Sequence, residues 1–179
     1  MNNSSNTLTV GSVNVDLSSM SEYVKRDLLL TLLKESVYKC YEKDYSLIRR
    51  GGMEQASMAR VYYYMQKALE QDPRFESFSA YKLDCEYNKN GEDPKWVEGV
   101  GDTRPDIILH NREDKPCKDN VLILEFKTHN NNDHGQDIRK LESFTNPQYD
   151  YRYFLGVFVK LKKDGPPEYR YFQNGRECE

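Results

Sequence analysis

The clearest pattern along the chain is a short stretch that changes from fully apolar to alternately charged. Residues 121–124 read Val-Leu-Ile-Leu, and a run that is apolar on both faces is typical of a strand buried at the centre of a sheet. Glu125 and Lys127 follow, and side chains alternate between the two faces of a strand. Both charges are therefore predicted on the face of Val121 and Ile123. Burying unpaired charge is costly, so these side chains require a partner, a metal ion or a water-filled cleft.

Further strand-like patterns lie on both sides of this stretch. They predict strands over residues 78–87, 106–110, 121–128, 151–161 and 168–172. The first alternates between apolar and charged positions, so it is expected to be half exposed. The last follows a turn at Asp164-Gly165 and is expected to form the edge of the sheet. The polar, turn-rich residues 88–101 and 111–120 are predicted as loops.

Apolar residues recur at helical spacing in three places. A helix is predicted from Ser21 to about residue 41, because one wide apolar face repeats along it. A second helix is predicted over 53–70 and a third over 134–144. Asp133 and Gln136 have the spacing of a capping box at the start of the third. The N-terminal lead segment, residues 1–18, has no such pattern and is expected to be flexible.

The order of these elements predicts the class of fold. Two helices, three strands, a helix and two strands indicate an α/β domain with a mixed central sheet flanked by helices. The third helix is a crossover between the third and fourth strands, so those two strands are expected to be parallel. We predict a single domain over 19–179 with its core over about 50–160.

Composition limits the classes of function. The formal net charge of −3 argues against loose, charge-driven binding of long nucleic acids, but an enzyme whose acidic site is neutralised by a metal ion fits it. No stretch reaches membrane-spanning length, and no secretory signal is visible. The four cysteines are scattered without a C-x-x-C pair and fit free thiols in a reducing compartment. We therefore expect a cytoplasmic protein that does not associate with membranes.

Two more acids join Glu125 as candidates for chemistry. Asp106 opens an apolar run, so it is predicted at the start of a strand beside that of Glu125. Carboxylates on neighbouring strands supply the oxygen ligands that Mg²⁺ prefers. Glu54 lies four residues before Met58 on the apolar stripe of the second helix. For Glu54 the alternative explanation is a helix-start glutamate favoured by the helix dipole.

Pro105-Asp106 and Glu125-Phe126-Lys127, in a strand, turn, strand, helix order, resemble the PD-(D/E)XK nuclease superfamily. The resemblance covers about residues 50–160. It implies a restriction-endonuclease-like αβββαβ core, here with an extra N-terminal helix. It also implies a metal-dependent nuclease, either an endonuclease or an exonuclease, that hydrolyses phosphodiester bonds in DNA or, less often, RNA. The cofactor would be Mg²⁺, with Mn²⁺ as a substitute.

The same resemblance assigns roles to the site residues. Asp106, Glu125 and the Phe126 backbone carbonyl would bind the metal ion. Glu54 matches an acid that many members carry on the preceding helix, and it would bind directly or through water. Lys127 would orient the attacking water or neutralise the scissile phosphate. The alternative for Lys127 is a purely structural salt bridge to Glu125 or Asp106.

Context distinguishes the chosen motif from a second copy. Glu113-Asp114-Lys115 also has the E-x-K pattern, but it lies in a polar loop before Pro116, where nothing would bury or aim it. The copy at 125–127 ends an apolar strand.

Five residues are candidate substrate contacts. Gln136 and Lys140 lie about one helical turn apart in the third predicted helix, where related nucleases place residues near the site. Arg49 and Arg50 precede a helix N-terminus and carry the charge for a phosphate. His129 continues the face of Lys127. An ordinary solvated position is the alternative explanation for each.

Three functions stay open on the sequence alone. The first is a metal-dependent nuclease, which requires Asp106 and Glu125 to converge. The second is a catalytically inactive module of the same fold that binds nucleic acid or a partner protein, and the acidic charge and small size motivate it. The third is an unrelated α/β domain, which predicts that the two acids lie far apart. No separate target-recognition region is visible, so specificity would come from nucleic-acid shape, a homodimer or a partner protein.

Overall fold

The structure is a computed structural model that describes residues 17–87, 89–90, 93–97, 100–112 and 120–179. The predicted flexible lead lies almost wholly outside these residues. The second E-x-K copy, Glu113-Asp114-Lys115, also lies outside them.

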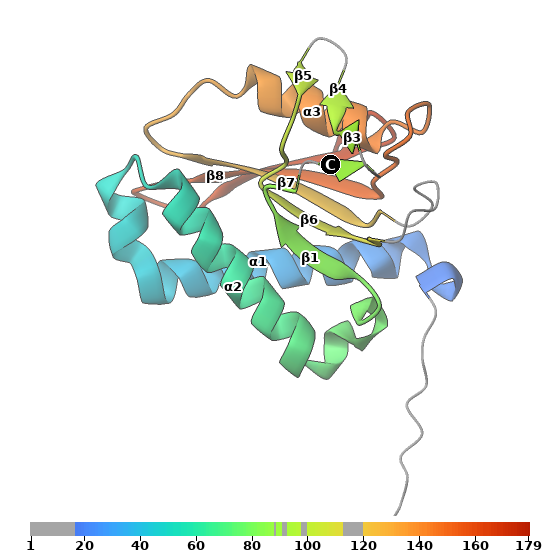
Figure 1. Cartoon of the computed structure of the whole chain (residues 1–179). Coiled ribbons are helices and arrows are strands. Elements are labelled where there is room, and N and C mark those ends of the chain that lie inside the picture. The colour runs from blue at the N-terminus through green and yellow to red at the C-terminus, as the bar shows by residue number, and fades with distance from the viewer. Residues whose placement is uncertain (1–16, 88, 91–92, 98–99, 113–119) are drawn as a thin grey trace, which may run out of the picture.

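A six-stranded sheet forms the centre of the molecule, in the order β1-β6-β7-β8-β9-β10 (Figure 1). Its only parallel pair is β7 with β8, and the other neighbours are antiparallel. The predicted α/β class with a mixed sheet, and the predicted parallel pair, are therefore confirmed. The strands are β1 (Lys82–Cys85), β6 (Ile107–His110), β7 (Leu122–Thr128), β8 (Leu155–Leu161), β9 (Glu168–Gln173) and β10 (Arg176–Cys178).

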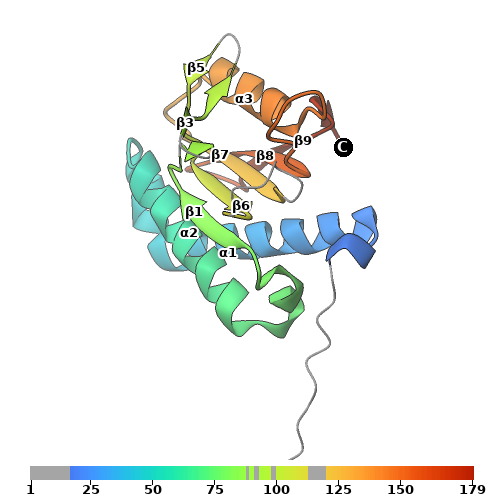
Figure 2. The ribbon, with the colours of Figure 1, turned by 45° about the vertical axis from the view of Figure 1, so that its right-hand side comes forward.

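Helices cover both faces of this sheet. Figures 1 and 2 show α1 (Glu22–Arg50) and α2 (Glu54–Gln71) on one side and α3 (Gly135–Thr145) on the other. The Ser21 side chain caps α1 by accepting a hydrogen bond from the Val24 N–H. The helix α1 runs past the predicted end near residue 41, through a kink at Asp44. Two short 3-10 helices, η1 (Leu17–Ser19) and η2 (Pro73–Phe78), complete the helical elements of the described residues.

The strand β7 divides its side chains between two apolar layers. Leu122, Leu124 and Phe126 pack in the layer beneath α1 and α2, whereas Ile123 packs in the layer beneath α3. Because side chains alternate along a strand, Glu125 and Lys127 continue the α3 side. Glu125 and Lys127 therefore share the face of Ile123, as predicted, and α3 covers it, whereas Val121, predicted on the same face, packs in the layer beneath α1 and α2.

The strand predicted over residues 78–87 is too long. The 3-10 helix η2 ends at Phe78 and a turn follows at residues 79–80, so the strand begins later than predicted and β1 covers Lys82–Cys85. Residues 88–101, predicted as a loop, contain two small antiparallel ribbons. These are β2 (Lys89–Asn90) with β3 (Asp93–Pro94), and β4 (Trp96–Val97) with β5 (Gly101–Asp102).

Two further predictions, on the edge of the sheet and on the start of the third helix, were also wrong. The strand β9 is not at the edge, because β10 returns after a turn at Asn174-Gly175, where both residues have positive φ. The capping box at Asp133 and Gln136 does not form. His134 is the N-cap of α3 instead, and its side chain makes no capping hydrogen bond.

Two glycines allow the close approaches that shape the site. Gly51 ends α1 with a φ of 66°, and a Cβ there would collide with the side-chain amide of Asn130. This contact holds the turn before α2 against the loop after β7. Gly156 in β8 lets α3 pack closely, because a Cβ there would lie 3.0 Å from the Thr145 methyl carbon. The first approach lies beside the end of β7, whereas Gly156 pairs with Ile123 near the start of β7.

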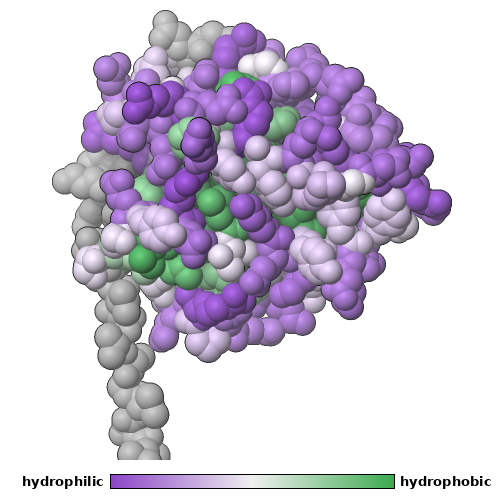
Figure 3. Space-filling model, turned by 180° about the vertical axis from the view of Figure 1, so that it is seen from behind, coloured by the Kyte–Doolittle hydropathy of each residue, from purple (hydrophilic) through white to green (hydrophobic). Residues whose placement is uncertain are grey.

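The surface seen from behind is mostly hydrophilic, with small hydrophobic patches between polar side chains (Figure 3). Among the described residues, none of the helices has the length and apolar character needed to cross a membrane. Cys40, Cys85 and Cys178 are free thiols, as predicted, and Cys117 lies outside the described residues.

Candidate active site

Asp106, immediately before β6, meets Glu125 at the middle of β7. The Asp106 carboxylate accepts a hydrogen bond of 2.6 Å from the Phe126 N–H, which fixes it beside the residue that follows Glu125. Burial raises the pKa of Asp106 to about 6, against opposing effects of that N–H and of two lysines. Burial, and then the negative charge of Asp106, raise the pKa of Glu125 well above its usual value. Continuing the register of β6 and β7 sets Asp106 opposite Glu125 on one face of the sheet, so the negative charge of Asp106 opposes the ionisation of Glu125.

Two lysines and a third acid surround this pair. Lys140 of α3 lies with its Nζ 3.1 Å from Glu125 Oε2 and 3.2 Å from Asp137 Oδ1. Lys127 of β7 lies with its Nζ 3.0 Å from Asp137 Oδ2. Asp137, in the first turn of α3, thus bridges both ammonium groups with its two carboxylate oxygens. It links the helix to the strand at the site.

Glu54, the first residue of α2, faces Lys127 rather than the Asp106–Glu125 pair. Its Oε1 lies 3.2 Å from Lys127 Nζ, and its Oε2 accepts a hydrogen bond of 3.3 Å from the Thr128 N–H. The structure thus brings the predicted Glu54 into the cluster, with both its oxygens already engaged by the end of β7.

Both lysines stay charged in this setting. Burial lowers the pKa of Lys127, but the carboxylates of Asp137 and Glu54 outweigh it and raise the pKa above the usual value. For Lys140 the balance has the same sign, with Glu125 and Asp137 as the opposing charges. Two ammonium groups are therefore held at fixed positions beside the acids.

The cluster carries more acid than base. It contains four carboxyl groups, from Glu54, Asp106, Glu125 and Asp137, and two ammonium groups, from Lys127 and Lys140. When all are ionised, two negative charges have no counter-charge within these six side chains. Glu125 is 1% exposed, and its Oε1 has no hydrogen-bond partner among the described residues. A buried carboxylate oxygen without a partner is costly, and a divalent cation would satisfy both deficits.

The local backbone suits the same ion. A residue in an antiparallel pair directs its N–H and its C=O to the same neighbouring strand, so the Phe126 carbonyl points to the side of Asp106. Continuing the register of β6 and β7 sets Pro105 opposite Phe126, and proline has no N–H to donate. The Pro-Asp sequence thus leaves that carbonyl without a ladder donor from residue 105.

The acids are not gathered into a complete metal cage. In the part of the chain that the structure describes, no group of three or more His, Cys, Asp or Glu side chains is arranged to hold a metal ion. Asp106, Glu125 and the Phe126 carbonyl would be the protein ligands, and water or substrate oxygens would fill the remaining positions. This donor set fits Mg²⁺, which keeps several waters and is usually bound through one or two carboxylates.

The other predicted residues lie in different settings. Lys140 is inside the cluster, whereas Gln136 is exposed on α3. Arg49 and Arg50 are exposed at the end of α1. His129 follows β7 and is half-buried, and within the described part of the chain its Nδ1 has no hydrogen-bond partner. Of these five candidate substrate contacts, the structure therefore brings only Lys140 into contact with the acids.

Asp137 is the site residue that the sequence did not reveal. An aspartate in the first turn of a helix is ordinarily explained by the helix dipole, so its presence there indicated nothing further. The signal that it offered was its three-residue spacing from Lys140, which puts the two on one helix face.

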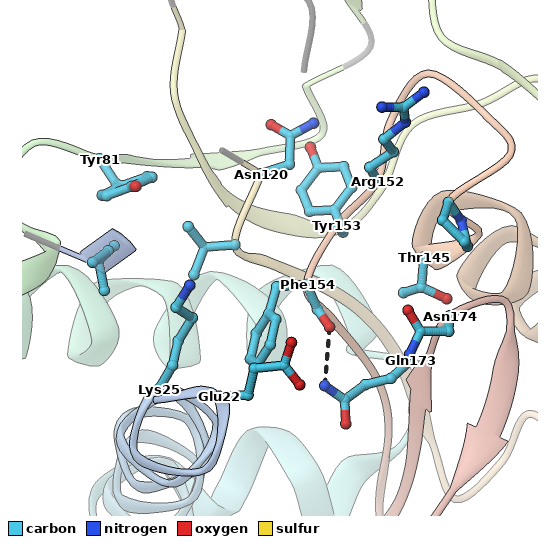
Figure 4. A pocket seen from close by; sticks show the side chains of 13 residues that line it. Glu22, Lys25, Tyr81, Asn120, Thr145, Arg152, Tyr153, Phe154, Gln173 and Asn174 are labelled. Carbon is cyan, nitrogen blue, oxygen red and sulfur yellow. Dashed lines mark hydrogen bonds between the residues drawn. The ribbon is translucent and has the colours of Figure 1, made fainter. Parts of the chain in front are cut away.

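A cavity of about 350 Å³ lies at the opposite end of the sheet, where β7 and β8 begin (Figure 4). None of the predicted site residues lines it. The Gln173 side-chain amide donates a hydrogen bond of 3.3 Å to the Phe154 carbonyl at its edge (Figure 4). Its charged and polar lining includes Glu22, Lys25, Asn120, Arg152 and Asn174.

Comparisons with family models, with curated proteins and with solved structures found no match to this chain. The resemblance to PD-(D/E)XK nucleases therefore depends on the residues and geometry described above.

The raised pKa of Asp106 predicts a pH-dependent loss of stability in the metal-free protein. Its pKa rises from 3.8 to about 6 on folding, so the folded state holds this proton more tightly. The contribution is fully present below about pH 4 and is lost as pH rises through about 6, a change on the order of 3 kcal/mol. Chemical unfolding in EDTA across this range should give a smaller loss for Asp106→Asn than for wild type. Equal pH profiles for the two proteins would contradict the buried, ionisable Asp106 described here.

Proposed function

We propose that this protein is a divalent-metal-dependent nuclease of the PD-(D/E)XK type that hydrolyses phosphodiester bonds, in DNA rather than RNA. The observation that carries the proposal is that Asp106 and Glu125 lie opposite each other on one face of the sheet, with Lys127 near Asp106 and with the buried Oε1 of Glu125 without a hydrogen-bond partner among the described residues. An unrelated domain whose acids are only surface charge would not bury Glu125 against Asp106.

The chain's own residues divide the work between holding a cation and handling charge. Asp106, Glu125 and the Phe126 carbonyl would hold Mg²⁺. When bound, Mg²⁺ supplies charge stabilisation at the phosphate and lowers the pKa of a bound water. Lys127 would orient that water or neutralise the scissile phosphate, because Glu54 and Asp137 hold its ammonium group at a fixed position. Lys140 would add a second positive charge beside Glu125.

The pairing of the lysines indicates what must change on metal binding. Lys140 contacts the Glu125 oxygen Oε2, and it also contacts Asp137, so it keeps a partner if a cation takes its place at Glu125. Asp137 would thus retain both lysines at the site while Glu125 exchanges one positive neighbour for another.

The direct test is cleavage of single-stranded, double-stranded and branched DNA, and of RNA, with Mg²⁺ or Mn²⁺. We expect at least one substrate to be cut in a reaction that EDTA abolishes. The absence of cleavage above the EDTA control on all three forms of DNA, with both metals, would contradict the proposal, and cleavage of RNA alone would contradict its choice of DNA.

A catalytically inactive module of the same fold is the second candidate. The observation in its favour is that Lys127 and Lys140 pair with acids of the cluster, and that no group of three His, Cys, Asp or Glu side chains is arranged for a metal among the described residues. This alternative predicts binding of nucleic acid or a partner protein without divalent ions, and full tolerance of Asp106→Asn.

A further inference from the structure

Trp96 is an exposed aromatic residue on a firmly attached ribbon. It is the sole tryptophan of the chain and is 56% exposed, although it belongs to a paired strand, β4. Large aromatic side chains dominate burial in protein cores, so one that a strand turns outward is informative. Its strand neighbour Val97 is buried in the apolar layer beneath α3. Because side chains alternate along β4, Val97 is buried and Trp96 points to the solvent.

The Tyr151 hydroxyl forms hydrogen bonds with both the N–H and the C=O of Trp96. The Trp96 N–H donates a hydrogen bond of 2.8 Å to the Tyr151 hydroxyl, which donates one of 3.0 Å to the Trp96 carbonyl. The Tyr151 ring packs on Phe144 of α3, with ring centroids 4.5 Å apart. Lys95, which precedes Trp96 in the chain, is buried, and its Nζ lies 4.5 Å from the centroid of the Tyr87 ring. The exposed indole is therefore carried by a rigid support.

This support lies on the catalytic side of the sheet. Figure 1 shows β4 and β5 beside α3, the helix that carries Asp137 and Lys140. Asp102, the partner of Trp96 across the ribbon, precedes Asp106 by four residues. Four extended residues and the spacing between two paired strands together limit the distance from Trp96 to Asp106 to about 20 Å. Arg104, between them, is exposed.

We infer that Trp96 is a stacking platform for an unpaired base of a single-stranded nucleic acid, whose backbone continues toward Asp106 and Glu125. The inference rests on the proposed function, because that function makes nucleic acid the ligand of this face. A flat, fixed aromatic ring stacks on any base, and such a contact contributes about 1–3 kcal/mol per base. Bases inside a duplex are already stacked, so the platform selects unpaired segments.

The sole tryptophan gives this inference a direct readout. In EDTA, which prevents cleavage, an oligothymidylate of about 12 nucleotides should quench the Trp96 fluorescence of the full chain. Anisotropy of the labelled oligonucleotide should show that Trp96→Ala binds about 5 to 150 times more weakly. Trp96→Phe keeps an aromatic face and should retain most of the affinity. Tyr38→Ala removes an exposed aromatic from α1, on the opposite side of the sheet, and should bind like wild type.

Each outcome bears on one of the two proposals. Binding without quenching, equal affinity of Trp96→Ala and wild type, equal quenching by a blunt duplex, or no binding at all would overturn the stacking role. Cleavage by wild type with Mg²⁺ while Trp96 stays unquenched would overturn this inference alone. Quenching by the single strand in a protein that never cleaves would leave this inference standing and overturn the nuclease.

Discussion

Replacing Lys127 by alanine is expected to lower the rate of phosphodiester cleavage by about two to three orders of magnitude. Its ammonium group is fixed by Glu54 and Asp137 at 3.2 and 3.0 Å, so it requires no reorganisation to act on a phosphate or a water. The measurement is the single-turnover rate on the best substrate with saturating Mg²⁺. Because Lys127 is not a predicted metal ligand, the variant should still bind Mn²⁺.

Lys43→Ala is the matched control for this change. Lys43 is exposed on α1 and pairs only with the neighbouring Glu42 among the ion pairs of the described residues. Its removal should leave the cleavage rate unchanged. A Lys127→Ala protein that folds, binds Mn²⁺ and cleaves within a fewfold of wild type would show that Lys127 has a structural role only.

The isosteric change Glu125→Gln should abolish cleavage without harming the fold. Removing the carboxylate charge removes a metal ligand, and we expect a loss of about a thousandfold or more in rate. The metal-free variant should be at least as stable as wild type, because burial and Asp106 already oppose the ionisation of Glu125. Lys140 keeps Asp137 as a partner. Cleavage rates and thermal unfolding in EDTA measure the two effects.

The opposite signs of these effects separate a catalytic from a structural Glu125. If Glu125 served mainly as a structural partner of Lys140, the variant would lose stability, and any loss of activity would follow from unfolding. Glu42→Gln, on the exposed surface of α1, should change neither quantity and serves as the control.

The parts of the site that follow from strand patterns could be predicted. The continuous apolar run before Glu125 identified β7, and the period of two assigned Glu125 and Lys127 to one face. The apolar run after Asp106 identified β6, and short separation along the chain made it a neighbour of β7. The convergence of Asp106 with Glu125 is a consequence of that pairing.

Other parts depend on tertiary contacts that leave little trace in a local pattern. Asp137 pairs with Lys127 on β7 and with Lys140 on its own helix. Its three-residue spacing from Lys140 was therefore the sole local sign that it belongs to the site. The capping box failed because His134 takes the N-cap position. The ribbon of β4 and β5 is held by Tyr151, 55 residues away from Trp96 in the chain, so its polar, glycine-containing sequence resembled a loop.

A calorimetric titration of Mn²⁺ into the metal-free protein tests the central claim most directly. We predict saturable binding by wild type that weakens by more than about a hundredfold in both Asp106→Asn and Glu125→Gln, since even the loss of an outer partner of a metal ligand can cost that much. A wild-type protein without a heat of binding, or variants that bind Mn²⁺ like wild type, would contradict a metal site at these two carboxylates.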